Sequence, residues 1–103
     1  MLNQVIIVGR LTSNIEIKER ENGGKIAKMT LAVPRSFKNA EGAYDTDFVK
    51  CILWDSIANN TAEYCNKGDV IGVKGRIQSE EDNMQIIAEK VTFLSSRKES
   101  EEK

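Results

Sequence analysis

Apolar and polar residues alternate over most of the chain, which is the pattern of half-buried β-strands rather than of helices. A β-branched run at residues 4–8 predicts a strand that continues, with a bend, into the alternating residues 15–18. Residues 21–24 predict a tight turn, because their glycines readily take the positive φ of hairpin turns. A second strand is expected at residues 25–33, and Pro34 should end it or bend it at a sheet edge.

The middle of the chain predicts a polar connection followed by a strand that is apolar on both faces. Residues 36–46 form the connection, in which Phe37 is an isolated aromatic residue. In the third strand, residues 47–54, one face carries Val49, Cys51 and Leu53, and the other carries Phe48, Lys50, Ile52 and Trp54. Such a strand is either covered on both sides or presents its second face to a ligand.

One helix and two further strands complete the pattern. Residues 56–66 predict the helix, with Asp55 or Ser56 as its N-cap and Gly68 at its end. Residues 70–77 and 84–94 predict strands joined by an acidic turn at 80–83, and Gly72 and Gly75 indicate a bend, a bulge or a close backbone approach. The order predicts an all-β fold, namely an OB-fold: a five-stranded Greek-key barrel with a helix between strands 3 and 4.

Composition limits the chain to one small domain and argues against an enzyme. The 103 residues (11.5 kDa) contain no histidine, which removes the commonest general base and metal ligand. Cys51 and Cys65 lack metal-ligand spacing, and we interpret them as small buried hydrophobic residues. We therefore expect no catalytic residue, no metal and no cofactor. The pattern of the chain predicts an OB domain at residues 1–95 and a short polar tail at 96–103, expected to be disordered.

Apolar patterning also bears on location. No apolar run approaches the length of about 20 residues that spans a bilayer, and the first residues lack a signal-peptide pattern. A cytoplasmic protein without a membrane partner is expected.

Net charge does not decide the partner. The formal net charge is -1, but residues 1–78 hold 11 basic and 9 acidic side chains, whereas residues 79–103 hold 4 basic and 7 acidic ones. The acidic excess is concentrated in residues 80–82 and 98–103, where a solvated turn and chain end are the simplest explanation.

A candidate binding surface follows from the placement of aromatic and basic residues. Phe48, Lys50 and Trp54 share one face of the third strand, and Phe37 lies between Arg35 and Lys38. Exposed aromatic side chains interleaved with cations suit unpaired nucleic-acid bases, which stack on the rings while the cations follow the phosphates. Periodicity alone leaves a second interpretation open, in which this face is buried under the helix or in a subunit interface.

Five segments together resemble bacterial single-stranded DNA-binding proteins in their order and spacing. They are LNQVIIVGRLT (2–12), MTLAV (29–33), TDF (46–48) leading to Trp54, AEYCNKG (62–68) and VKGRIQ (73–78). The resemblance runs from residue 1 to about residue 95.

The resemblance implies a homotetramer of OB-folds that binds and protects single-stranded DNA without sequence preference in replication, recombination or repair, in the cytoplasm and at the nucleoid. By resemblance, the bases would stack on Phe37, Phe48 and Trp54. The phosphates would be contacted by Lys38 and Lys50, and further by Arg10, Arg35 and Arg76.

Three departures from the family pattern qualify these expectations. The long, basic, aromatic hairpin between the last two strands shrinks to the acidic residues 80–83, so weaker binding or a shorter site is expected. Ile15 stands where the family has a proline near the bend of the first strand. Residues 98–103 lack the acidic-hydrophobic tip that recruits replication and repair proteins, so that role is not carried over.

Two other functions fit the same fold. One is a dimeric, primosome-type OB relative, and the other is an OB module that binds protein, which the net charge and the acidic turn favour. Salt separates them from DNA binding, because phosphate contacts make affinity fall steeply as salt rises.

Overall fold

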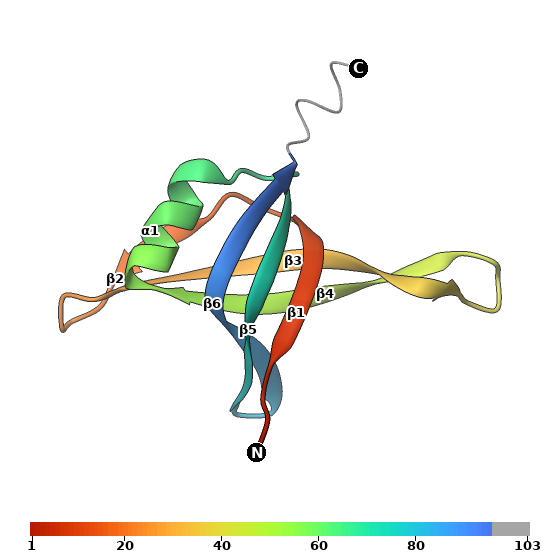
Figure 1. Ribbon diagram of the computed structural model, residues 1–103, viewed down its shortest axis with the longest axis horizontal. Coiled ribbons are helices and arrows are strands. Elements are labelled where there is room, and N and C mark those ends of the chain that lie inside the picture. Colours follow the sequence, from red (N-terminus) through yellow and green to blue (C-terminus); the bar gives the residue numbers. More distant parts are fainter. Residues whose placement is uncertain (96–103) are drawn as a thin grey trace.

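A computed structural model describes residues 1–95 and contains six strands and one helix in that range (Figure 1). The elements are β1 (Val5–Leu11), β2 (Glu16–Glu19), β3 (Lys25–Lys38), β4 (Tyr44–Trp54), α1 (Asp55–Tyr64), β5 (Val70–Glu80) and β6 (Asn83–Ser95). The tail expected at residues 96–103 lies outside the described residues. Among those described, no helix has the length and apolar character needed to cross a membrane.

Five of the strands close into a barrel. Neighbouring strands follow the order β1-β5-β6-β4-β3-β2, and β1 also pairs with β3 through Arg10↔Ala32 and Leu11↔Leu31. The pairing of β1 with β3 closes the ring and leaves β2 at the outer edge of β3. The sequence-based expectation of a five-stranded OB barrel with a helix between its third and fourth strands is confirmed.

The first strand is interrupted rather than continuous. At the break, the Leu11 amide donates to the Asp69 carbonyl (2.8 Å) and the Thr12 amide donates to the Thr30 carbonyl (3.1 Å). These bonds turn the chain from β1, which pairs with β5, toward β2, which pairs with β3. The bend between residues 11 and 15 is therefore sharp enough to split the predicted strand in two.

Inward-pointing aliphatic residues from every barrel strand form one core. The largest fully buried side chains are Leu11, Leu31, Leu53, Ile71, Val73 and Cys51. Burial raises the pKa of the Cys51 thiol to about 11, so it stays protonated at neutral pH. Cys65 is also buried, which confirms that both cysteines are core residues.

Helix α1 covers one end of the barrel, but its ends differ from the prediction. It begins at Asp55 and ends at Tyr64, and its buried residues are Ala58 and Thr61. The N-cap residue is Trp54 rather than Asp55 or Ser56, and no side chain forms a capping hydrogen bond there. The Asp55 carboxylate instead accepts the Lys25 amide (3.0 Å) at the start of β3. Gly68 lies beyond the helix end, where its amide donates to the Leu11 carbonyl.

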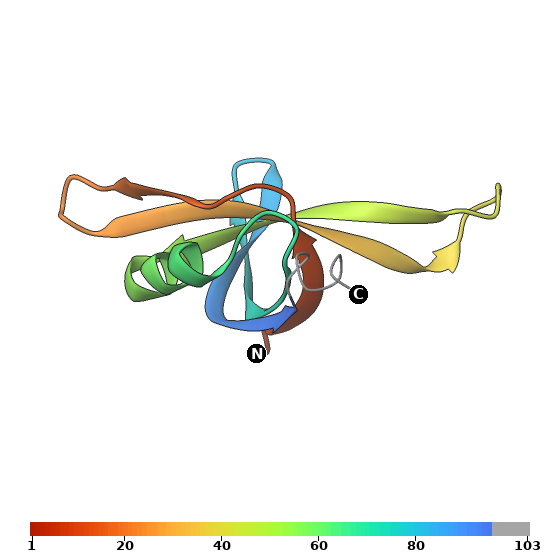
Figure 2. The ribbon, with the colours of Figure 1, turned by 90° about the horizontal axis from the view of Figure 1, so that it is seen from above.

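Strand β3 does not end at Pro34. It continues to Lys38, pairs with β4 on both sides of the proline, and shifts register between Pro34 and Lys38. A proline has no amide hydrogen to donate, and an irregularity of the ladder is where a strand tolerates it. The predicted polar connection at 36–46 is therefore mostly strand. We call residues 35–47 the arm, which extends away from the barrel (Figures 1 and 2).

Gly75 marks the predicted bulge. The β5–β6 register shifts between Lys74 and Gly75. A Cβ atom at residue 75 would lie 2.0 Å from the Ile87 carbonyl oxygen, so only glycine allows β6 to approach this closely.

Candidate nucleic-acid interface

The predicted binding residues of β4 lie on one solvent-facing sheet surface. The cross-strand pairs Ala32↔Phe48, Thr30↔Lys50, Lys28↔Ile52 and Ile26↔Trp54 place the outward residues of β3 and β4 in four successive rows. The intervening residues, including Met29, Leu31, Cys51 and Leu53, point into the core. We call this surface, residues 26, 28, 30, 32, 48, 50, 52 and 54, the outer face.

Phe48 is the most exposed member of this face among its large apolar residues. Its side chain is 68% exposed, and α1 packs elsewhere, against the end of the barrel. Within the described chain, the helix therefore does not bury this part of the face. Of the two kinds of burial that periodicity left open, burial under the helix is thus excluded for Phe48.

Arg10 joins the same row as Phe48. It pairs with Ala32 across β1 and β3, and Ala32 pairs with Phe48 across β3 and β4. Directly paired residues point to the same side of a sheet, so Arg10 borders the outer face. Its Nη1 also donates to the Gly68 carbonyl (2.6 Å), which fixes the side chain.

Trp54 lies at the other end of the outer face and is already covered by a cation. The guanidinium carbon of Arg20 is 4.7 Å from the centre of the Trp54 ring, within range of a cation–π contact. The predicted turn at residues 21–24 holds Arg20 there, because the Arg20 amide donates to Gly24 (2.7 Å) and its carbonyl accepts from Gly23 (2.9 Å). The sequence carried no signal for this contact, since it joins two separate hairpins.

The arm carries Phe37 and Lys38 away from the barrel, together with an aromatic residue that sequence reasoning missed. Tyr44 is the cross-strand partner of Lys38, whose Nζ lies 5.9 Å from the centre of the tyrosine ring. Phe37 and Tyr44 are both largely exposed. Tyr44 shares the parity of Phe48 along β4, but this is not apparent from the sequence, whose pattern predicts a polar connection at residue 44.

Asn39 organises the tip of the arm. Its side-chain oxygen accepts the amides of Glu41 (2.9 Å) and Ala43 (3.0 Å), and its side-chain nitrogen donates to Asp45 (3.0 Å). Gly42 takes the positive φ of 83° that closes the turn. The arm is thus a hydrogen-bonded hairpin with exposed side chains, held by local polar contacts rather than by the core.

Arg35 lies on the arm next to two carboxylates. Its Nη2 lies 2.9 Å from Asp47, and its Nη1 lies 3.8 Å from Asp45. The hydrogen bond to Asp47 raises the pKa of Arg35, and the same bond lowers the pKa of Asp47. Part of the positive charge predicted to meet phosphate is therefore already balanced.

Arg76, like Arg10, lies two strands from β4, but it is reached through β6 rather than through β3. It pairs with Ile87 on β6, and Ile87 in turn neighbours Ile52 on β4. Its guanidinium donates to Gln78 (2.8 Å) and lies 4.0 Å from Glu89. The fold thus brings Phe48, Lys50 and Trp54 to one face and places Phe37, Lys38 and Arg35 on the arm. Arg10 borders the outer face on the β3 side, and Arg76 lies on the β6 side.

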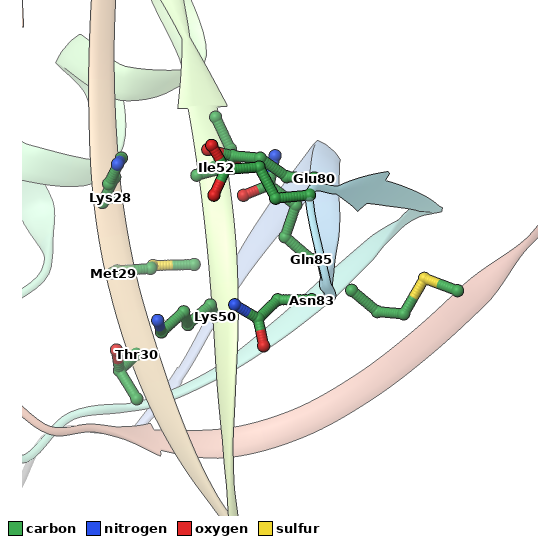
Figure 3. Close-up of a pocket in the computed structure, with 10 residues that line it drawn as sticks. Lys28, Met29, Thr30, Lys50, Ile52, Glu80, Asn83 and Gln85 are labelled. Carbon is green, nitrogen blue, oxygen red and sulfur yellow. The ribbon is translucent and has the colours of Figure 1, made fainter.

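The short acidic hairpin between β5 and β6 borders the outer face. Strand β5 extends to Glu80 and β6 begins at Asn83, so only Glu81 and Asp82 form the turn. Ile52 points outward from β4 yet is only 3% exposed. Glu80 and Ile52 both line the pocket between this hairpin and β4 (Figure 3).

A second exposed apolar surface lies on β1. Ile6 and Val8 are 71% and 50% exposed, on the side of β1 that faces away from the core. Leu94 lies near this surface, because its Cδ1 and Val8 Cγ2 both approach Gly72. Val5 and Ile7 pack against the core on the other side, so β1 is apolar on both sides.

The carboxylates and thiols of the described part of the chain do not form a metal-binding cluster. Residues 1–95 contain no group of three or more histidine, cysteine, aspartate or glutamate side chains that could hold a metal ion. Asp45 and Asp47, which the sequence places near each other, face Arg35 instead.

Comparison with known proteins gives a consistent result. Residues 2–94 match the model of the single-strand binding protein family. Over 79 residues, 77% of this chain, the sequence is 52% identical to the single-stranded DNA-binding protein B of Bacillus subtilis. Over 94% of this chain, it is 42% identical to the single-stranded DNA-binding protein of Halalkalibacterium halodurans and 41% identical to single-stranded DNA-binding protein 3 of Listeria innocua. These alignments cover 70%, 63% and 66% of the respective relatives.

Proposed function

The chain belongs to the single-strand binding protein family, and we propose that it is a non-enzymatic protein that binds single-stranded DNA on the outer face and the arm. Single-stranded DNA offers unpaired bases and one negative charge per phosphate. Rings on the protein can stack on the bases at about 1–3 kcal/mol per base, and cations can neutralise the phosphates. Because every base has a π-face, stacking requires little sequence preference.

The single observation that carries this proposal is the exposed aromatic and basic row on a strand whose opposite face is core. Phe48 and Lys50 are exposed on β4, while the alternating residues Cys51 and Leu53 are fully buried. An exposed ring beside an exposed cation on one strand face suits an unpaired base and its phosphate.

We assign stacking to Phe37, Phe48 and Trp54, and we add Tyr44 because it lies on the arm beside Lys38. Lys38, Lys50 and Arg10 are proposed as the principal phosphate contacts. Arg35 and Arg76 are proposed as weaker contacts, because Asp47 and Glu89 already balance part of their charge.

The biological setting follows from the family. We propose that the protein protects single-stranded DNA during replication, recombination or repair, in the cytoplasm and at the nucleoid. No protein partner is assigned.

We further propose that the protein assembles as a homotetramer, with the exposed side of β1 covered by a second copy. Ile6 and Val8 together with Leu94 offer an apolar surface for this contact, on the same side of β1 as Arg10 and further toward Val5.

The direct test of the DNA site compares two exposed aromatic residues. Phe48→Ala should weaken binding of a thymine oligonucleotide by about 1–3 kcal/mol, because it removes one stacking ring. Tyr64→Ala is the matched control: its ring at the end of α1 is 67% exposed, against 68% for Phe48, but lies off the outer face. Equal losses in both variants, or no loss in a folded Phe48→Ala protein, would refute the assigned site and favour an OB module that binds protein.

A further inference from the structure

A pocket of about 210 Å³ separates the outer face from the β5–β6 hairpin (Figure 3). Met29, Ile52 and Met84 add apolar atoms to its lining, although Met29 and Ile52 are themselves buried. Lys28 and Lys50 of the outer face border one side. The side chains of the hairpin border the other side, among them Glu80, Glu81, Asn83 and Gln85.

The polar groups of this pocket have no partners within the protein. Among residues 1–95, none of the lysine, glutamate, asparagine or glutamine side chains that line it makes a hydrogen bond or ion pair to another residue. The neighbouring cations Arg10, Arg35 and Arg76 all have such partners. The pocket therefore keeps donors on one side and carboxylate acceptors on the other.

This combination suits the polar edge of a single planar base. Figure 3 shows the Asn83 amide directed toward β4 at Lys50, while Glu80 extends over Ile52. A base entering this pocket would meet ammonium and amide donors on one part of its edge and carboxylates on another. Unstacked bases are recognised through such edges when single strands bind.

We propose that this pocket favours a base with an exocyclic amino group, cytosine in particular, over thymine, an inference that rests on the single-stranded DNA binding proposed above. The cytosine N4 amino group donates hydrogen bonds, and a glutamate carboxylate can accept them. Thymine instead presents the O4 carbonyl oxygen at that position, which a carboxylate repels. Lys28, Lys50 and the amides donate to the acceptor atoms of cytosine.

The test measures a ratio within each protein, so that general effects of net charge cancel. Fluorescence anisotropy gives the dissociation constants for labelled oligocytidylate and oligothymidylate of equal length. In the double variant Glu80→Gln/Glu81→Gln, the neutral amides can also donate to thymine. The preference for cytosine relative to thymine should therefore fall by about threefold to tenfold.

Asp82→Asn is the matched control, because Asp82 belongs to the same turn but does not line the pocket. It should strengthen binding of both oligonucleotides equally and leave the ratio unchanged. A cytosine-to-thymine ratio that stays constant in the double variant, or that shifts as much in Asp82→Asn, overturns the proposed base preference of the pocket. Wild-type protein that binds neither oligonucleotide overturns the proposed function instead.

Discussion

At the scale of single residues, a cation is available to DNA when no carboxylate of the protein already pairs with its charge. Lys50 lies on the outer face with no ion-pair partner among the described residues, whereas Arg35 lies 2.9 Å from Asp47. Both were predicted phosphate contacts, since sequence shows charge but not pairing across a hairpin. The cross-strand registers supply that information.

Trp54 and Arg20 lead to a prediction at this scale. Trp54→Ala should weaken binding of single-stranded DNA by about 1–3 kcal/mol, because one stacking platform is lost. Arg20→Ala removes a cation but uncovers the indole, so the affinity should change less than in Trp54→Ala. The quench of Trp54 fluorescence on binding should become larger in Arg20→Ala. Unchanged affinity in a folded Trp54→Ala protein would contradict the role of this ring.

At the scale of elements, the alternation of apolar and polar residues predicted the barrel strands, in which one face is buried. It did not predict the strands of the arm, in which both faces are exposed. The core residues of β3, Met29 and Leu31, produce the period that revealed the strand. The arm has no such period because both of its faces are exposed, and its hairpin depends on Asn39 and on cross-strand pairing. The helix cap was missed for a related reason, since Asp55 bonds to a distant strand.

The bulge in β5 gives a prediction about stability. Gly75→Ala should destabilise the fold by about 1–3 kcal/mol, as overpacking does, because its Cβ would meet the Ile87 carbonyl oxygen at 2.0 Å. Gly72→Ala serves as the control: the nearest atom to its Cβ would be Leu94 Cδ1, at an ordinary 3.7 Å. Urea denaturation of both variants would measure the difference, and equal stability would refute the close approach.

At the scale of the whole molecule, the barrel assembles one surface from segments far apart in sequence. Arg10 reaches the outer face only because β1 closes onto β3, and Arg20 reaches Trp54 only because two hairpins meet. Sequence reasoning could therefore name Phe48, Lys50 and Trp54 as one face, since they share a strand. It could place Arg10 only through family resemblance, and it could not find Arg20 or the pocket at Glu80.

The exposed side of β1 leads to a prediction about assembly. Ile6→Glu should lower the molar mass of the protein in solution, because a buried carboxylate would oppose contact between two copies across this apolar surface. Sedimentation analysis of wild type and variant would measure it. A wild-type protein that is monomeric, or a variant whose assembly is unaffected, would exclude this surface as the interface.

The most direct test of DNA binding is a titration with a thymine oligonucleotide, followed by tryptophan fluorescence at low and at moderate salt. Trp54 is the only tryptophan, so any quench reports from the outer face. We predict saturable quenching, with the logarithm of affinity falling against the logarithm of salt by about 0.7 for each phosphate contacted. The contradicting result is no quenching together with no binding by anisotropy, or binding that salt leaves unchanged.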